Sequence, residues 1–156
     1  MLYFAYGSNL DPARMNGRCP TAKFVCRAAL PNHRLCFPRA GGMPAHGVAG
    51  IAVCCSSSTW GVIYEVPEFD MKSLDKAEGY HPERMPEDNS YNREPCQVLQ
   101  EGDHARPIAA QAYFAVAQPN PPLPSATYMC HIIEGARYWH LPDEYIAELE
   151  AIEVQE

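Results

Sequence analysis

The chain opens with Leu2-Tyr3-Phe4-Ala5-Tyr6-Gly7-Ser8-Asn9-Leu10, an apolar run that stops abruptly at a small polar turn. A run without polar alternation is typical of a short strand that is covered on both faces. Gly7 permits a positive φ or a close approach of the backbone, and the side chains of Ser8 and Asn9 offer local hydrogen bonds. The junction between this strand and its turn is therefore the first candidate for a functional site.

The residues that follow the turn strengthen this interpretation. Asp11 and Pro12 are typical of the N-cap and the first residue of a helix, which predicts a short helix over residues 12–16. The turn then lies beside the positive end of that helix, and its backbone N–H groups are expected to face a bound anion. The same pattern also fits an ordinary strand-to-helix turn, so both interpretations stay open at this point.

Composition limits the chain to one domain and argues against several classes of function. The 156 residues are enough for one hydrophobic core, so we expect a single domain over residues 1–156. A net charge of −7 with 12 Lys and Arg argues against a nucleic-acid partner, because phosphate neutralisation needs clustered basic side chains. The sequence has no run of ~18 apolar residues and no leader pattern, so we expect no membrane segment and a cytoplasmic location.

The spacing of cysteines and histidines predicts no metal site. The seven cysteines contain no C-x-x-C pair, and their odd number without an export signal favours reduced thiols. Cys36, Cys54 and Cys130 stand in apolar contexts, which predicts that they are small core residues. The histidines show no i, i+4 pair of the kind that binds a metal on a helix.

Strand patterns dominate the chain. Stretches of β-prone residues between Pro-rich and Gly-rich connections predict strands at 2–6, 23–29, 33–37, 48–55, 60–66, 91–99 and 107–117. Besides the helix after the first strand, helical spacing predicts helices at 68–78, 126–136 and 143–152. The last helix carries an apolar stripe that is expected to dock on the sheet. These elements indicate an α+β protein.

Glu78 is the candidate catalytic residue. It immediately precedes the helix-stopping Gly79 and shares a helix face with Met71 and Leu74. Desolvation on an apolar stripe disfavours the charged carboxylate and raises its pKa toward neutrality, as a group that both accepts and donates a proton requires. Asp75, by contrast, is expected to be solvated. The alternative is a frayed helix end at which Glu78 reaches water.

Three segments occur in one order across nearly the whole chain. They are the turn within residues 3–10, the strand and helix at 60–66 and 68–79, and the segment 124–153 with its Pro-Ser-Ala-Thr-Tyr start at 124–128. Together they resemble the γ-glutamylcyclotransferase-like family of the AIG2-like superfamily, with the middle segment similar to the family's unit that carries a catalytic glutamate. This resemblance implies a small mixed β-barrel, closed or nearly closed, with flanking helices.

The resemblance also implies a reaction and its substrate. The α-amine of a small-molecule γ-glutamyl substrate attacks its own γ-carbonyl, which closes the ring of 5-oxoproline and expels an amino acid or amine. Such a reaction needs no covalent nucleophile, metal or cofactor, only a bent substrate and a base. Glu78 is implied to take the ammonium proton and to hand it to the leaving nitrogen.

The residues implied to bind the substrate surround this base. They are Tyr6, Gly7, Ser8, Asn9, Leu10, Tyr91 and Tyr128. Backbone amides of the turn are implied to hold the substrate carboxylate or the developing oxyanion, and the phenols to supply further hydrogen bonds. The resemblance leaves open whether Tyr80 or Tyr91 takes the second tyrosine position.

The segment 80–90 departs from the family pattern because it is long, charged and rich in proline. We expect it to be a mobile lid that selects the leaving group. Arg84 and Arg93 are candidate partners for a substrate carboxylate, with solvated surface charges as the alternative. Activity on γ-glutamyl amines, biosynthetic removal of a γ-glutamyl group, and a non-catalytic binding module stay open, as does a homodimer.

Overall fold

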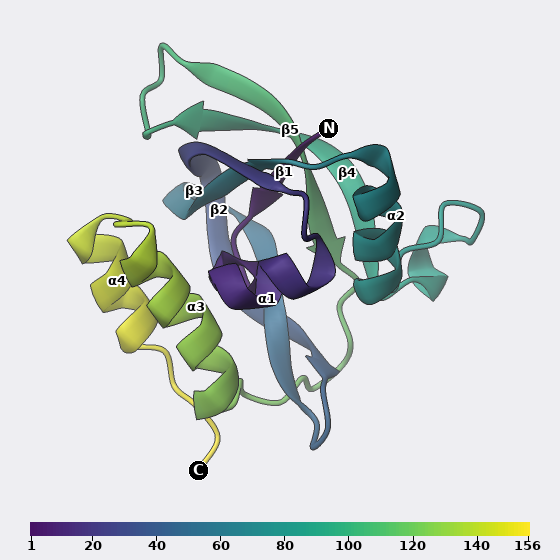
Figure 1. Ribbon diagram of the computed structural model, residues 1–156. Coiled ribbons are helices and arrows are strands. Elements are labelled where there is room, and N and C mark those ends of the chain that lie inside the picture. The colour runs from purple at the N-terminus through teal and green to yellow at the C-terminus, as the bar shows by residue number, and fades with distance from the viewer.

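Five strands close into a barrel in the computed structural model, which describes residues 1–156 (Figure 1). The strands are β1 (Leu2–Ala5), β2 (Lys23–Gly41), β3 (His46–Glu65), β4 (Tyr91–Gln100) and β5 (Pro107–Ala115). Their order around the barrel is β1-β3-β2-β4-β5, and β5 closes it by pairing in parallel with β1 at Tyr3 and Gln111. All other neighbouring strands are antiparallel. The α+β class and the small mixed barrel are thereby confirmed.

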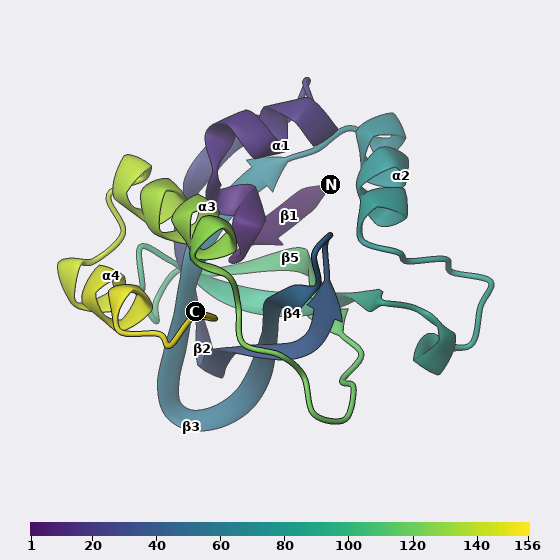
Figure 2. The ribbon, with the colours of Figure 1, turned by 90° about the horizontal axis from the view of Figure 1, so that it is seen from below.

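Helices surround this barrel on two sides (Figures 1 and 2). The elements are η1 (Ser8–Leu10), α1 (Pro12–Arg18), α2 (Glu68–Ala77), η2 (Pro86–Asp88), α3 (Ala126–Tyr138) and α4 (Asp143–Glu150). α3 and α4 lie side by side, α2 lies on the opposite side, and α1 lies between them. α1 begins as the sequence predicts, because the Asp11 side chain accepts a hydrogen bond from Ala13 N at 2.9 Å and Pro12 follows as the first helical residue. None of the helices is long and apolar enough to cross a membrane.

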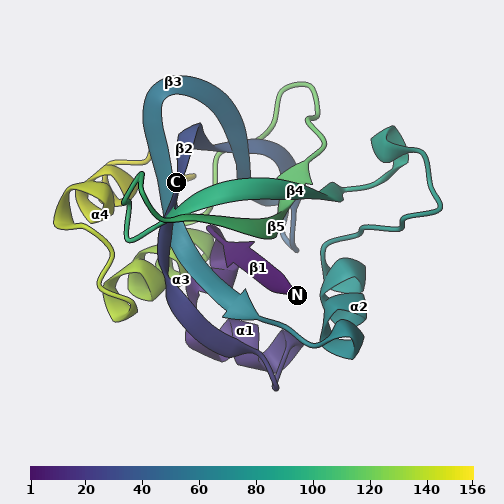
Figure 3. The same ribbon diagram turned by 90° about the horizontal axis from the view of Figure 1, so that it is seen from above.

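Two long curled strands replace four of the predicted short ones. The segments 23–29 and 33–37 both belong to β2, and 48–55 and 60–66 both belong to β3. Between these segments the register shifts, with Asn32 at a φ of 58° and Ser56 at a φ of 66°. Such irregularities bend a strand without ending it. The small polar residues that resemble strand breaks are therefore the points at which the hairpin curls, as the arc of β3 shows (Figure 3).

The prediction that Cys36, Cys54 and Cys130 are core residues is wrong. Cys19 and Cys26 are buried, whereas Cys36 and Cys54 are half-buried and Cys130 is exposed. Cys130 lies in α3, whose neighbouring buried positions face the barrel and leave Cys130 pointing outward. An apolar sequence context does not show which face of a helix a residue occupies.

The turn η1 is clamped between the barrel and α3. Leu10 is fully buried, and its carbonyl oxygen accepts a hydrogen bond from Trp139 Nε1 at 2.9 Å. A methyl group added at Gly135 of α3 would lie 2.4 Å from the carbonyl carbon of Leu10. The backbones of helix and turn therefore touch directly, which fixes the turn relative to every side chain that α3 presents.

Gly135→Ala is expected to lower the free energy of unfolding by about 1–3 kcal/mol, because the new methyl group overpacks against the backbone of Leu10. Gly17→Ala is the matched control, since nothing lies within 4 Å of a methyl group added at this α1 position. It is expected to stabilise the protein by up to about 1 kcal/mol through helix propensity. Chemical denaturation measures both. Similar effects of the two substitutions would contradict the direct contact between α3 and η1.

Candidate active site

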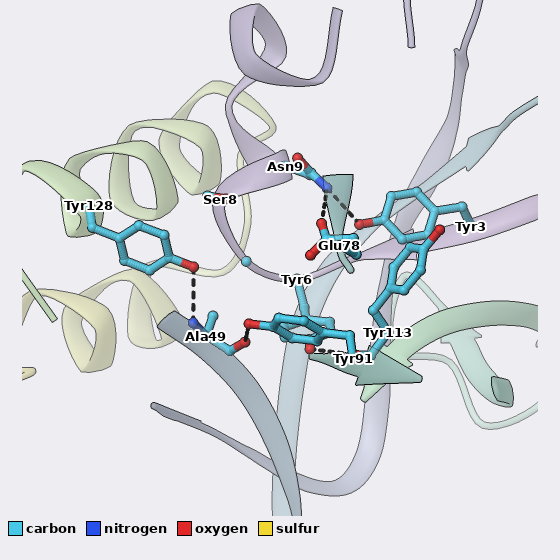
Figure 4. A pocket seen from close by; sticks show the side chains of 10 residues that line it. Tyr3, Tyr6, Ser8, Asn9, Ala49, Glu78, Tyr91, Tyr113 and Tyr128 are labelled. Atoms are coloured by element: carbon cyan, nitrogen blue, oxygen red, sulfur yellow. Dashed lines mark hydrogen bonds between the residues drawn. The ribbon is translucent and has the colours of Figure 1, made fainter. Parts of the chain in front are cut away.

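A small cavity ringed by tyrosines lies where β1 runs into η1 (Figure 4). Its volume is about 30 Å³. The residues that line it are Tyr3, Tyr6, Gly7, Ser8, Asn9, Ala49, Glu78, Tyr91, Tyr113 and Tyr128. They come from β1, η1, β3, the end of α2, β4, β5 and α3, so the fold gathers them from nearly the whole length of the chain.

Glu78 enters this cavity because α2 ends there. Its backbone N–H donates to Leu74 O at 2.9 Å, and the next residue, Gly79, has a φ of 67°. This left-handed glycine stops the helix as the sequence predicts. The Glu78 side chain is only 16% exposed and points toward the turn η1 (Figure 4). The predicted burial is confirmed, and the alternative of a frayed, solvated helix end is wrong.

One carboxylate oxygen of Glu78 makes all of its hydrogen bonds. Asn9 Nδ2 donates to Oε1 at 3.2 Å, and Arg18 Nη1 donates to the same atom at 3.1 Å. Arg18 Nη1 also donates to Asn9 Oδ1 at 2.9 Å, and Asn9 Nδ2 donates to the Tyr3 hydroxyl at 3.0 Å. The other oxygen, Oε2, accepts no hydrogen bond from the protein. It is therefore the oxygen that is available to exchange a proton.

Opposing effects act on the pKa of Glu78. Burial is the largest and raises the pKa, because the charged form loses its hydration. The positive charge of Arg18, the hydrogen bond from Asn9 and the charge of Arg14 lower it, in that order. The net result is a pKa of Glu78 above the ordinary value for glutamic acid.

The tyrosine hydroxyls are tied to the backbone around the cavity. Tyr91 donates to Ala49 O at 2.5 Å, while Ala49 N donates to the hydroxyl of Tyr128 at 2.9 Å (Figure 4). Tyr6 donates to the carbonyl oxygen of Tyr113 at 2.5 Å. Burial raises the pKa of these three phenols and of the phenol of Tyr113. They therefore stay protonated and present polar edges on rigid, apolar rings.

The turn predicted from the opening stretch lies at the cavity. Leu10 N donates to Gly7 O, so the amides of Ser8 and Asn9 precede the first hydrogen bond of the turn and have no acceptor within it. Gly7 has a φ of −107°, which other residues also adopt. A methyl group there would lie 3.1 Å from Ala49 Cβ. Of the two predicted reasons for this glycine, close approach is the one that the structure uses.

The assignment of Leu10 is corrected, and the open choice between Tyr80 and Tyr91 is decided by the cavity lining. Leu10 does not line the cavity, because the tight turn rotates its side chain into the core beneath α3. The second tyrosine of the cavity is Tyr91 and not Tyr80. The ring of Tyr80 lies 5.6 Å from the guanidinium of Arg93, outside the cavity.

Asp75 is not solvated, contrary to the sequence-based expectation. Its Oδ1 accepts a hydrogen bond from the Tyr113 hydroxyl at 2.6 Å and lies 3.0 Å from Arg93 Nε. The side chain is 13% exposed, because it lies one turn before Glu78 on the face of α2 that packs on the barrel. Arg93 is thus bound to a carboxylate of the protein itself and supports the wall of the cavity through Tyr113.

The loop 80–90 does not cover the cavity. It projects from the end of α2 away from the barrel (Figures 1 and 3), and no residue from 80 to 90 lines the cavity. Asn89 closes the base of the loop, since its side chain accepts a hydrogen bond from His81 N and donates to His81 O, both at 3.2 Å. The expectation of a lid over the site is wrong for this arrangement.

Sequence reasoning missed four residues of the site. These are Tyr3, Arg18, Ala49 and Tyr113. Tyr3 lies inside the quoted opening stretch, where a hydroxyl in an otherwise apolar strand is a usable signal for a buried polar partner. Ala49 makes its hydrogen bonds through its backbone, and Arg18 reaches the site from the last turn of α1, so neither has a signal in local sequence.

Comparison with known proteins agrees with this geometry. The sequence pattern of the AIG2-like family matches residues 58–149. A protein of Homo sapiens named γ-glutamylcyclotransferase is 34% identical over 97% of this chain and 78% of its own. This chain belongs to the AIG2-like family. The γ-glutamylcyclotransferase of Mus musculus is 31% identical over 99% of this chain and 80% of its own.

A solved structure titled γ-glutamyl cyclotransferase shares the AIG2-like fold of this chain. It aligns with a TM-score of 0.87 and 31% identity over 100% of this chain and 89% of its own. The resemblance seen in the sequence is confirmed over the full length. Glu78 therefore lies on a strand-helix unit of a fold that this chain shares with a protein named γ-glutamyl cyclotransferase.

The pKa of the Glu78 carboxyl is expected to lie above the ordinary range of glutamic acid, and Arg18→Gln to raise it further by removing a positive charge 3.1 Å away. Arg18→Lys keeps the charge and is the matched control, with a smaller rise. Titration of the side-chain carboxyl by ¹³C NMR measures all three proteins. An unchanged Glu78 titration in Arg18→Gln would contradict the role given to this ion pair.

Proposed function

We propose that this protein is a γ-glutamylcyclotransferase, which converts γ-glutamyl amino acids or small γ-glutamyl peptides into 5-oxoproline and a free amino acid. The observation that carries the proposal is the buried Glu78 carboxyl, anchored through Oε1 and free at Oε2 beside the Gly7 turn. Homologues of this name that match nearly the whole chain support it.

The reaction requires a base for the ammonium group of the substrate. Glu78 Oε2 takes one proton from the α-ammonium, and the freed amine attacks the γ-carbonyl carbon of the same molecule. The new carbon–nitrogen bond closes a five-membered ring as the bond to the leaving nitrogen breaks, and Glu78 returns its proton to that nitrogen. The ring nitrogen loses a second proton, which the released amine takes up, so the products are a lactam with a neutral nitrogen and an amino acid in its ammonium form. A carboxyl with a raised pKa suits both steps, because neither proton transfer is strongly uphill.

The turn and the phenols hold the charges of the substrate in this proposal. The amides of Ser8 and Asn9 have no acceptor within η1 and lie at the cavity, where they can bind a carboxylate or the developing oxyanion. Tyr91 and Tyr128 are fixed by their bonds to the backbone of Ala49, so they hold the bent substrate without reorganising.

Glu78→Gln is expected to lower the rate of 5-oxoproline formation from γ-glutamyl-L-alanine by about 10²- to 10⁴-fold, because the amide cannot accept the proton. Glutamine keeps an oxygen acceptor for Arg18 and Asn9. The raised pKa of Glu78 means that its stabilising contribution is present at low pH and is lost as pH rises through that pKa. The substitution is therefore not expected to lower the melting temperature at neutral pH.

The exposed Glu68 on the same helix provides the control, and Glu68→Gln is expected to keep wild-type turnover. Chromatographic quantification of 5-oxoproline and thermal unfolding follow all variants. Activity of a folded Glu78→Gln protein within a few-fold of wild type would refute the assignment of the base.

Gly7→Val is expected to abolish the thermal protection given by a γ-glutamyl ligand, because the added side chain collides with Ala49 and pushes the turn out of position. Ser8→Ala keeps the backbone amide and is expected to weaken protection only in part. A thermal-shift titration compares them. A larger loss from Ser8→Ala would show that side chains, and not the backbone, hold the ligand.

A further inference from the structure

A larger hollow shares the lining residue Tyr128 with the cavity. It lies between α1, the tip of the β2–β3 hairpin and the first turn of α3, and its volume is about 430 Å³. Tyr128 lines both spaces. Its hydroxyl accepts the hydrogen bond from Ala49 N at the cavity (Figure 4), and its ring lies 4.8 Å from the ring of His46 in the hollow. A γ-glutamyl amino acid is too large for a cavity of about 30 Å³, so part of it must extend beyond.

Arg14 lines this hollow and has no partner in the protein. Its Nε is buried without an acceptor, although buried polar groups in folded proteins are rarely left unsatisfied. Arg18 and Arg93 each lie within 3.1 Å of a carboxylate, and Arg39 donates a hydrogen bond to Val116 O at 2.7 Å. Arg14 lines this hollow together with Tyr128, and Tyr128 also lines the cavity that contains Glu78.

The charges around the hollow favour an anion. No Asp or Glu side chain lines it. His131 lines the hollow, and its Nδ1 lies 2.7 Å from the carboxylate of Asp11. Asp11 also caps α1 by accepting a hydrogen bond from Ala13 N. The ring of His46 bonds its neighbour's carbonyl oxygen, Gly47 O, at 3.0 Å. The guanidinium of Arg14 is thus the one side chain of the hollow that carries a full positive charge at every physiological pH and lacks a counter-charge.

We propose that Arg14 binds the α-carboxylate of the leaving amino acid and thereby selects γ-glutamyl amino acids over γ-glutamyl amines. The inference rests on the proposed function. In an amino acid, the carboxylate lies two bonds from the nitrogen that leaves, so it must be bound close to the group that protonates this nitrogen. Arg14 lies in the hollow that shares Tyr128 with the cavity of Glu78, and a guanidinium offers a carboxylate two parallel hydrogen bonds.

The test compares two substrates that differ only in this charge, γ-glutamyl-L-alanine and γ-glutamyl-L-alaninamide. Wild-type protein is expected to prefer the acid. Arg14→Gln is expected to lower kcat/KM for the acid by about 10- to 100-fold, the usual value of a hydrogen bond to a charged group, and to change the amide by less than about threefold. Arg14→Lys is expected to recover part of the preference. Because Glu78 acts on both substrates, any indirect effect through its pKa cancels in the ratio.

Arg18→Gln is the matched control, since it removes a charge that touches Glu78 but does not line the hollow. It is expected to lower turnover of both substrates by the same factor. Equal losses on both substrates in Arg14→Gln, or a wild-type protein without preference, would overturn this inference alone. Absence of 5-oxoproline from both substrates with wild-type protein would overturn the proposed function and the inference with it.

Discussion

The site depends on the buried carboxyl of Glu78, whose pKa burial raises and a neighbouring cation partly lowers. Burial at the end of α2 makes the charged form of Glu78 costly, and the nearby guanidinium of Arg18 offsets part of that cost. Without the cation the pKa of Glu78 would be higher, and without burial it would be lower. Arg18 and Asn9 both bind Oε1, so Oε2 is free to exchange a proton with the substrate.

The barrel serves to hold this arrangement rigid. β1 is central, paired with β3 on one edge and β5 on the other, and it delivers the turn η1 to the cavity. α3 presses on the same turn at Gly135 and presents Tyr128 from two turns earlier in the helix. α2 brings Glu78 and, through Asp75, fixes Tyr113. Each wall of the cavity is thus an end or a face of a packed element, and the flexible-looking loop 80–90 takes no part.

Local sequence carries the elements and the chemistry but not their spatial relations. The opening strand, its turn, the N-cap at Asp11 and the burial of Glu78 follow from residue types and helical spacing. The closure of the barrel followed only from family resemblance, because strand order is not encoded in periodicity. The expectations for Leu10, Asp75 and the loop 80–90 are wrong for one reason. Each depends on which side of an element faces the barrel, and local sequence does not give this. Arg18 and Arg14 acquire their meaning from contacts made across the fold, and no local pattern marks them.

The central claim is that the substrate's own amine, and not water, displaces the leaving group in a site built around Glu78. Incubation of the purified protein with γ-glutamyl-L-alanine in ¹⁸O-labelled water, followed by mass spectrometry, tests this most directly. The account predicts unlabelled 5-oxoproline and alanine in equal amounts. Glutamate that carries ¹⁸O in its γ-carboxyl would show hydrolysis instead and would contradict the account.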